Sequence, residues 1–205
     1  MTSQPFHNLS YQYYPKMENK FNFTDEELIA RFQEGDEQAY VMIVSRYRDR
    51  LVNFIYRFMN DRDQAEDLAQ DTLLKLYTHK HYYKQIAKFS TWIYTIASNI
   101  AKTELRKKKN RKTTSLTKMG LDDKDYDLPA PEQADKETDN EYLGKKIQAA
   151  IDKLPENFKS VAILRDIQEL PYDEISNILN VPLGTVKSRI NRARLQLQEE
   201  LKSIL

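Results

Sequence analysis

The chain has 205 residues, room for one large domain or two small ones, and its hydrophobic fraction of 40% and charged fraction of 31% are those of a globular protein. The absence of cysteine excludes disulfides and thiolate metal sites and suits the reducing cytoplasm, where we expect the protein to act. Apolar runs such as Val41–Val44 are far too short to span a membrane, and the N-terminus lacks a secretory signal. We therefore expect no direct membrane insertion.

The first half of the chain shows helical periodicity after an irregular start. Residues 1–22 carry aromatic side chains without helical spacing, which indicates a loose N-terminal extension. Thr24 and Glu27 form a capping box, a second such box is expected from Asp63 and Glu66, and Ser90 is expected to cap a fourth helix. Each predicted helix carries one narrow apolar stripe, so one face is buried and the other is solvated. These patterns predict a compact helical domain over residues 23–112.

Charge is distributed unevenly where this domain ends. Residues 102–112 hold seven basic side chains and one glutamate, whereas residues 113–144 hold nine acids and three lysines. The basic run has two interpretations: a solvated helix end favoured by the helix dipole, or a phosphate-binding surface. The second is preferred because another basic segment follows later in the chain. Residues 113–140, with Gly120, Pro129 and Pro131, are predicted to form a flexible acidic linker.

The strongest pattern lies between Pro171 and Leu205, near the end of a second helical unit over residues 141–205. The sequence YDEISNIL predicts a short helix, Asn180–Pro182 interrupt it, and a longer helix follows. A short helix, a tight turn and a basic-faced helix make the geometry that fills a major groove of duplex DNA. We therefore predict a DNA-binding helix-turn-helix.

The last helix separates its apolar side chains from its polar ones. Val186, Ile190, Ala193 and Leu197 fall on one stripe, and at about 100° per residue the polar groups lie opposite or on its flanks. The candidate DNA-binding residues are Thr185, Lys187, Ser188, Arg189, Asn191, Arg192 and Arg194. Asn and Arg can pair with base edges, while Lys, Ser and Thr suit phosphates. An ordinary amphipathic hairpin with a charged face is the alternative, and the outward-facing Leu195 is not explained.

Several motifs together resemble one family. The string LPYDEISNILNVPLGTVKSRINRAR resembles the C-terminal DNA-binding region of bacterial RNA polymerase sigma factors, in particular the extracytoplasmic-function group. DEELIARFQEGDEQAY, DRDQAEDLAQDTLLKLY and FSTWIYTIASNIAKTELRKKK are similar, in order, to successive parts of that family's region 2. The resemblance covers Phe23–Leu205 apart from the linker. It implies an all-α protein with two small helical domains, sigma region 2 and sigma region 4, joined by a flexible linker.

The family resemblance also implies a mechanism without a catalytic centre or cofactor. A sigma factor binds core RNA polymerase and directs it to promoter DNA; region 2 recognises and melts the minus-ten element, and region 4 reads the minus-thirty-five element. By resemblance, the loop before the fourth helix takes a flipped-out base, and aromatic and basic groups hold the opened strand. The minus-ten candidates are Trp92, Asn99, Lys102, Arg106 and Lys107. Trp92 lies on the apolar stripe, so it is equally a candidate for the core.

Two protein partners, core polymerase and an anti-sigma factor, follow from the same resemblance. Asp67, Gln70 and Asp71 resemble the residues that bind the clamp helices of the largest polymerase subunit, and region 4 is expected to meet the flap region. Members of this group are commonly held by an anti-sigma factor, so such a partner is expected.

The acidic linker is hypothesised to follow the path of nucleic acid before promoter entry, and neutralising its acids should alter abortive initiation or nonspecific DNA binding.

Two other classes of protein compete with this interpretation. A transcription regulator that never joins the polymerase would explain the C-terminal motif but not the ordered region 2 motifs. A DNA-strand-transferring recombinase would need a nucleophile with supporting groups, and no serine has an evident base partner. His79 and His81 alone lack the further ligands that a metal site needs, so no metal is expected.

Overall fold

The computed structural model describes residues 23–119 and 139–202, and at 112–119 and 139–141 the helical backbone alone. Regular structure within these ranges is entirely helical, as the sequence predicts. The predicted N-terminal extension and most of the predicted linker lie outside the described residues. No helix among the described residues is both long and apolar enough to cross a membrane.

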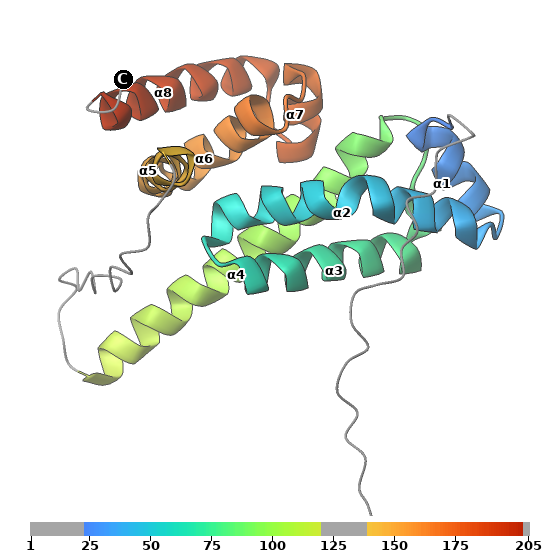
Figure 1. The fold of residues 1–205 in the computed structure, drawn as a ribbon, viewed down its shortest axis with the longest axis horizontal. Coiled ribbons are helices and arrows are strands. Elements are labelled where there is room, and N and C mark those ends of the chain that lie inside the picture. The colour runs from blue at the N-terminus through green and yellow to red at the C-terminus, as the bar shows by residue number, and fades with distance from the viewer. Residues whose placement is uncertain (1–22, 120–138, 203–205) are drawn as a thin grey trace, which may run out of the picture.

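The first domain is a bundle of four helices. Its elements are α1 (Asp25–Gln33), α2 (Glu37–Met59), α3 (Arg62–Thr78), the 3-10 turn η1 (Lys80–Tyr82) and α4 (Phe89–Met119). Helices α2, α3 and α4 lie side by side, and α1 packs across one end (Figure 1). Apolar side chains such as Phe32, Phe54 and Ile93 are fully buried at their centre. Burial of each such side chain contributes about 1.5–3 kcal/mol, so the apolar stripes supply the stability of the bundle.

The helix starts agree with the sequence in one case and differ in two. Thr24 and Glu27 form the expected capping box, with Glu27 N 3.2 Å from Thr24 Oγ1 and Thr24 N 2.7 Å from Glu27 Oε2. The box predicted at Asp63 is wrong, because the side chain of Asp61 caps α3 by accepting from Gln64 N at 3.0 Å. Ser90 is not a cap either, because it lies inside α4, one residue after its start. The backbone of α4 continues to Met119, into the segment that the sequence assigned to the linker.

The second domain comprises the remaining helices. These are α5 (Asp139–Lys153), α6 (Glu156–Ala162), the π-helical turn η2 (Ile163–Ile167), α7 (Tyr172–Leu179) and α8 (Leu183–Leu201). The π turn continues α6, since Gln168 N bonds to Ile163 O at 3.0 Å, five residues back. Helix α8 packs on α6, α7 and α5 through Val186, Ile190 and Ala193, the predicted stripe.

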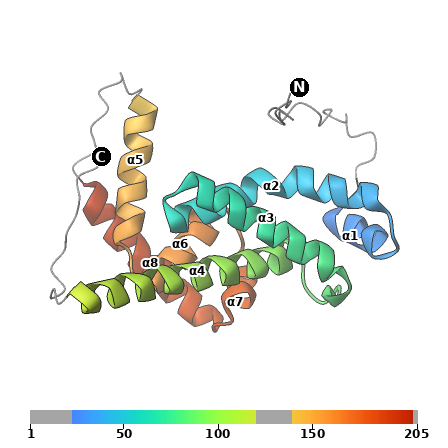
Figure 2. The ribbon, with the colours of Figure 1, turned by 90° about the horizontal axis from the view of Figure 1, so that it is seen from below.

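The two domains are in contact with each other. Helix α7 lies against α4, and α5 and η2 lie against α2 (Figure 2). One continuous cluster of buried side chains runs through both domains, from Leu28 in α1 to Ala193 in α8. The sequence predicted two helical units but gave no indication that they share a core.

Candidate nucleic-acid interface

Helix α7 spans the predicted YDEISNIL, and α8 begins at Leu183, directly after the predicted interruption. Residues 203–205, where the predicted motif ends, lie outside the described residues. Asn180 ends α7 in the left-handed conformation, with φ 51°, and two further residues complete the turn before α8. The hydroxyl of Ser176 donates to Val181 O at 2.5 Å and fixes the path of the chain between the helices. Asparagine tolerates positive φ better than most residues, so the chemistry of the turn matches its geometry. The orientation of α8 therefore follows from a rigid turn and a buried stripe.

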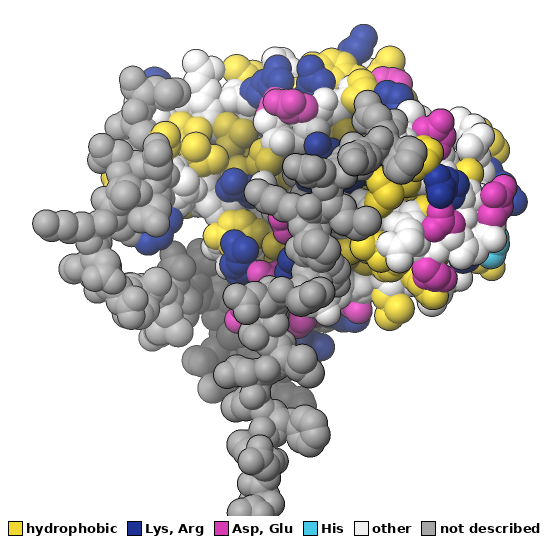
Figure 3. All heavy atoms as spheres, turned by 45° about the vertical axis from the view of Figure 1, so that its right-hand side comes forward, with side chains coloured by type: hydrophobic (Ala, Val, Ile, Leu, Met, Phe, Trp, Pro, Cys, Tyr) yellow, Lys and Arg dark blue, Asp and Glu magenta, His cyan; other side chains and the backbone are white. Residues whose placement is uncertain are grey.

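Most of the predicted DNA-binding residues of α8 are accessible. Lys187, Ser188, Asn191 and Arg192 are exposed, and Thr185 and Arg189 are partly buried. Dark blue Lys and Arg side chains are visible along the upper edge of the molecule, where Figure 1 places α7 and α8 (Figure 3). A basic, polar helix face of this kind can approach a phosphate backbone and present Asn and Arg to base edges.

Arg194 is also exposed, but its charge is paired with an acid. Its guanidinium forms an ion pair with Asp166 of η2, in which Nε lies 3.3 Å from Asp166 Oδ2. The hydrogen bond with Asp166 raises the pKa of Arg194 above its usual value. This arginine therefore ties α8 to η2, and the sequence did not indicate the pairing.

Leu195 is exposed on the same side of α8 as Asn191 and Arg192, with a relative exposure of 58%. It lies four residues beyond Asn191, one helical turn further along that face. Nothing in the structure explains an apolar side chain at this position.

The candidate minus-ten residues lie along α4. Asn99, Lys102 and Arg106 recur at steps of three and four residues and therefore share one face of the helix. Asn99 and Arg106 are exposed, and Lys107 is exposed but pairs with Glu104 at 3.2 Å. Trp92 is partly buried and packs against Tyr83, with ring centroids 5.4 Å apart. The sequence left open whether Trp92 packs on the core or stacks on a base, and in the structure it packs on the core.

Lys102 lies at the boundary between the domains. Burial lowers the pKa of this lysine below its usual value; the nearby Glu156 of α6 opposes the shift, and Arg189 of α8 adds to it. A residue predicted to contact the minus-ten element and one predicted to contact the minus-thirty-five element thus lie close together. Both are partly buried.

Helix α1 holds the loop before α4, a contact that the sequence did not predict. Gln33 Nε2 donates to Lys80 O at 2.6 Å and to Tyr83 O at 3.1 Å, and Lys80 Nζ donates to Phe32 O at 2.9 Å. At the far end of the loop, Phe89 N donates to Glu26 Oε1 at 2.9 Å. These hydrogen bonds join residues that lie 47 to 63 positions apart in the chain, so no local sequence pattern could reveal them.

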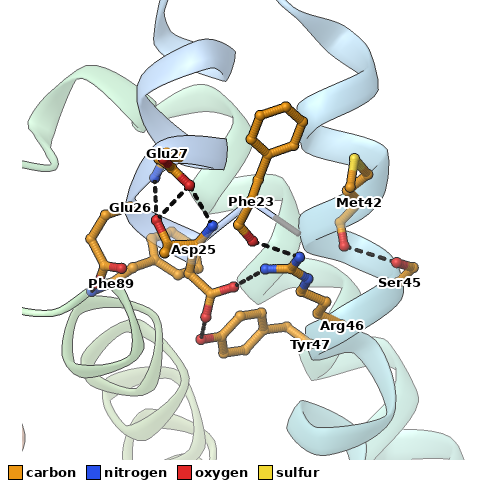
Figure 4. A network of polar contacts seen from close by, with 10 residues as sticks. Phe23, Asp25, Glu26, Glu27, Met42, Ser45, Arg46, Tyr47 and Phe89 are labelled. Atoms are coloured by element: carbon orange, nitrogen blue, oxygen red, sulfur yellow. Dashed lines mark hydrogen bonds and ion pairs between the residues drawn. The ribbon is translucent and has the colours of Figure 1, made fainter. Parts of the chain in front are cut away.

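Helix α1 is itself attached to α2 by a polar network (Figure 4). Asp25 accepts from Arg46 Nη1 at 2.7 Å and from Tyr47 Oη at 2.6 Å. Burial raises the pKa of Tyr47 well above its usual value, and the hydrogen bond with Asp25 adds to the shift. The tyrosine therefore stays a neutral donor, and the network gives the loop a rigid support.

The tip of this loop points into solvent. Ile86 is 92% exposed and Tyr82 is 74% exposed, and both are flanked by lysines such as Lys84 and Lys88. Exposed aromatic rings stack on the bases of a single strand, and neighbouring cations contact its phosphate backbone. The predicted strand-binding segment is therefore displayed on a loop whose two ends are fixed.

The predicted polymerase-binding residues lie on the exposed face of α3, opposite the buried stripe of the same helix. Asp67, Gln70 and Asp71 are exposed, whereas Leu68 and Leu76 are buried. They form an acidic face that is accessible with the domains in contact. Complementary charge on a partner would speed its association with such a face.

Comparison with known proteins identifies the class to which this architecture belongs. A family model described as sigma-70 region 2 matches residues 43–111, and one described as sigma-70 region 4 matches residues 144–197. The ECF RNA polymerase sigma factor SigW of Bacillus subtilis is 35% identical over 184 residues, which cover 86% of this chain and 96% of SigW.

Solved structures agree with this match. The sigma factor RpoE from Bartonella quintana, in complex with the anti-sigma factor NepR, aligns with a TM-score of 0.63 and 26% identity over 80% of this chain and 96% of its own. CnrH in complex with the cytosolic domain of CnrY aligns with a TM-score of 0.67 over 87% of this chain and 97% of its own, and at 18% identity it supports the fold alone.

The two helical domains are thus those of the sigma-70 class, arranged in the expected order. The chain belongs to the extracytoplasmic-function family of bacterial RNA polymerase sigma factors. Its function is the promoter-directed initiation of transcription by RNA polymerase, and its relatives regulate transcription rather than catalyse a reaction.

Proposed function

We propose that residues 23–112 and 141–205 divide the recognition of a promoter between them. The first domain binds the minus-ten element and holds its opened strand, and α8 of the second domain reads the minus-thirty-five element. Neither domain performs catalysis or needs a cofactor, because positioning and strand separation use binding energy alone. The protein acts in the cytoplasm, where core polymerase and DNA are found.

One observation carries the assignment of α8. Ser188, Asn191 and Arg192 are exposed on one face of a helix whose other face is buried and whose start is fixed by a tight turn. This is the geometry in which a recognition helix enters a major groove. Arg192 and Asn191 are assigned to base edges, and Lys187, Ser188 and Thr185 to the phosphate backbone.

The first domain is assigned to the opened strand on its exposed groups. The loop tip with Ile86 and Tyr82 stacks on unpaired bases, and Asn99 and Arg106 of α4 follow the backbone of the same strand. Lys102 joins this surface when the second domain moves away. Lys107 contributes less, since Glu104 neutralises it.

Three protein contacts complete the proposal. Asp67, Gln70 and Asp71 bind the clamp helices of the largest subunit, and the second domain meets the flap region. An anti-sigma factor holds the free protein, as its relatives with solved structures include sigma factors bound to one.

Run-off transcription with core polymerase tests the whole assignment. The purified chain and core enzyme are incubated with genomic fragments, and transcripts are mapped to their start sites. We expect discrete starts that depend on the chain, each preceded by shared elements. Transcripts that are unchanged when the chain is omitted would contradict the proposal.

A further inference from the structure

The contact between the two domains contains a buried carboxylate. Glu174 of α7 is 5% exposed, and its Oε1 lies 2.8 Å from Lys88 Nζ. Its Oε2 accepts from Ser90 Oγ at 3.0 Å and from Thr91 Oγ1 at 3.3 Å. All three of these partners belong to the first domain, so the charge of Glu174 is compensated across the domain boundary. We call this group of four residues the Glu174 contact.

Such a contact favours closure, because a buried charge without partners is costly. If these partners were removed while Glu174 stayed buried, its charge would be left uncompensated, which is strongly unfavourable. Glu174 escapes that cost either by keeping its partners or by becoming exposed to water as the domains separate. Two further polar contacts bind the domains together: Tyr94 Oη donates to Gln168 Oε1 at 2.6 Å, and Arg57 Nη1 donates to Gln148 Oε1 at 3.0 Å.

The partners of Glu174 form a site for an anion. They comprise an ammonium group, two hydroxyl groups and the first turn of α4, where the helix dipole is positive. The same set of groups binds the phosphates of nucleic acids. The carboxylate of Glu174 stands in the position that a backbone phosphate would take.

The closed arrangement is incompatible with promoter binding. Compact domains of 90 and 65 residues have radii of gyration of about 12 and 11 Å, so their centres lie roughly 30 Å apart when they touch. Elements centred near positions −10 and −35 are separated by about 25 base pairs, or roughly 85 Å along B-form DNA at about 3.4 Å per pair. The domains must therefore separate before both elements are bound.

We propose that the Glu174 contact keeps the free chain closed by occupying a phosphate site at the start of α4. When the domains separate, the opened promoter strand takes the place of Glu174 at Lys88, Ser90 and Thr91. The second half of this inference rests on the proposed function of the first domain. Lys102, partly buried beside Arg189 and Glu156, is uncovered in the same step.

Closure is measured directly by energy transfer between two dyes. The chain holds no cysteine, so Gln38→Cys on α2 and Gln198→Cys on α8 give two unique labelling positions, both exposed. We expect a higher transfer efficiency in the parent than in Glu174→Ala, with Glu174→Gln between them. Glu169→Gln is the matched control, since it makes the same change as Glu174→Gln at an exposed glutamate of the second domain. Circular dichroism confirms that each variant remains helical.

Competition with phosphate is measured with a single-stranded oligothymidylate of 12 nucleotides, whose backbone is the probe. If the parent is closed nine-tenths of the time, opening raises its apparent affinity about tenfold, since apparent affinity scales with the competent fraction. We expect that gain in Glu174→Ala and its loss in Glu174→Ala with Lys88→Ala. We also expect the oligonucleotide to lower energy transfer in the parent.

The outcomes separate the parts of the inference. Equal transfer efficiency in the parent and Glu174→Ala would overturn the role of Glu174 in closure, even if run-off transcription succeeds. Loss of transfer without a gain in oligonucleotide affinity would overturn the phosphate site. A Glu174 effect on both readouts, in a chain that fails to support run-off transcription, would sustain the inference about closure and reject the proposed function.

Discussion

Arg57 of α2 and Gln148 of α5 bind each other twice across the domain boundary. Arg57 Nη1 donates to Gln148 Oε1 at 3.0 Å, and Gln148 Nε2 donates to Arg57 O at 3.3 Å. Gln148 is 4% exposed, so both of these bonds are shielded from water. One amide therefore satisfies both a donor and an acceptor that α2 presents to the second domain.

Substitution Gln148→Ala should destabilise the protein, because it leaves buried groups of Arg57 without partners. The expected loss is about 1–3 kcal/mol, the usual cost of an unsatisfied buried polar group. Urea unfolding followed by circular dichroism measures it. Gln198→Ala, an exposed change of the same chemistry on α8, should alter stability by less than about 0.5 kcal/mol. Equal effects of the two substitutions would show that the Arg57 contact contributes nothing.

The face assignment of α8 predicts different effects for two cationic residues. Arg192→Ala should weaken discrimination at one base pair by about 1–3 kcal/mol, because a base-edge contact is lost. Lys187→Ala should lower affinity for all sequences and reduce the salt slope by about 1. Binding of the purified chain to a set of single-base variants of the minus-thirty-five element, at several salt concentrations, distinguishes them. A uniform loss from both substitutions would contradict the assignment of Arg192 to a base.

The acidic face of α3 predicts a kinetic effect on polymerase binding. Asp67→Asn with Asp71→Asn should slow association with core enzyme, and the difference should shrink as salt screens the charges. Surface plasmon resonance with immobilised core polymerase gives the rate constants. Glu34→Gln, which neutralises an exposed acid at the end of α1, serves as the control. An equal reduction by the control would assign the effect to net charge rather than to this face.

Helix caps provide a test of a sequence expectation that the structure corrects. Asp61 is the residue whose side chain accepts from Gln64 N, whereas Asp63 lies within the first turn of α3. Asp61→Ala should therefore cost about 1 kcal/mol of stability, and Asp63→Ala less, because only a dipole interaction is lost. Thermal unfolding of the two variants gives the comparison. A larger loss of stability from Asp63→Ala would show that Asp63 caps α3, as the sequence suggested.

The features that the sequence predicted correctly depend on residues close to one another in the chain. The stripe Val186, Ile190 and Ala193 fixed the buried face of α8, and Thr24 with Glu27 marked the start of α1. Each of these signals lies within about two helical turns, the range over which periodicity acts. The motif order then revealed the family, and with it the fold.

Contacts between distant residues were beyond that range. The attachment of the loop to Gln33 and the burial of Glu174 depend on how the helices pack, and a glutamate on a short amphipathic helix is ordinarily solvated. Asp61 and Asp63 both suit a helix start, so sequence could not choose between them. Trp92 likewise fits both a core and a stacking role, and its packing against Tyr83 depends on the position of the loop before α4, which the sequence does not predict.

The ion pair between Arg194 and Asp166 changes the role that the sequence assigned to this arginine. A guanidinium held by a carboxylate is less available to a phosphate, so Arg194→Ala should reduce DNA affinity much less than Lys187→Ala. Asp166→Asn should have the opposite effect: it frees Arg194, raises nonspecific affinity and steepens the salt slope by up to about 0.9, the value for one phosphate contact. Titration of a duplex without promoter elements at several salt concentrations measures both. If Arg194→Ala removes as much affinity as Lys187→Ala, Arg194 leaves Asp166 to bind DNA, and the ion pair belongs to the free protein alone.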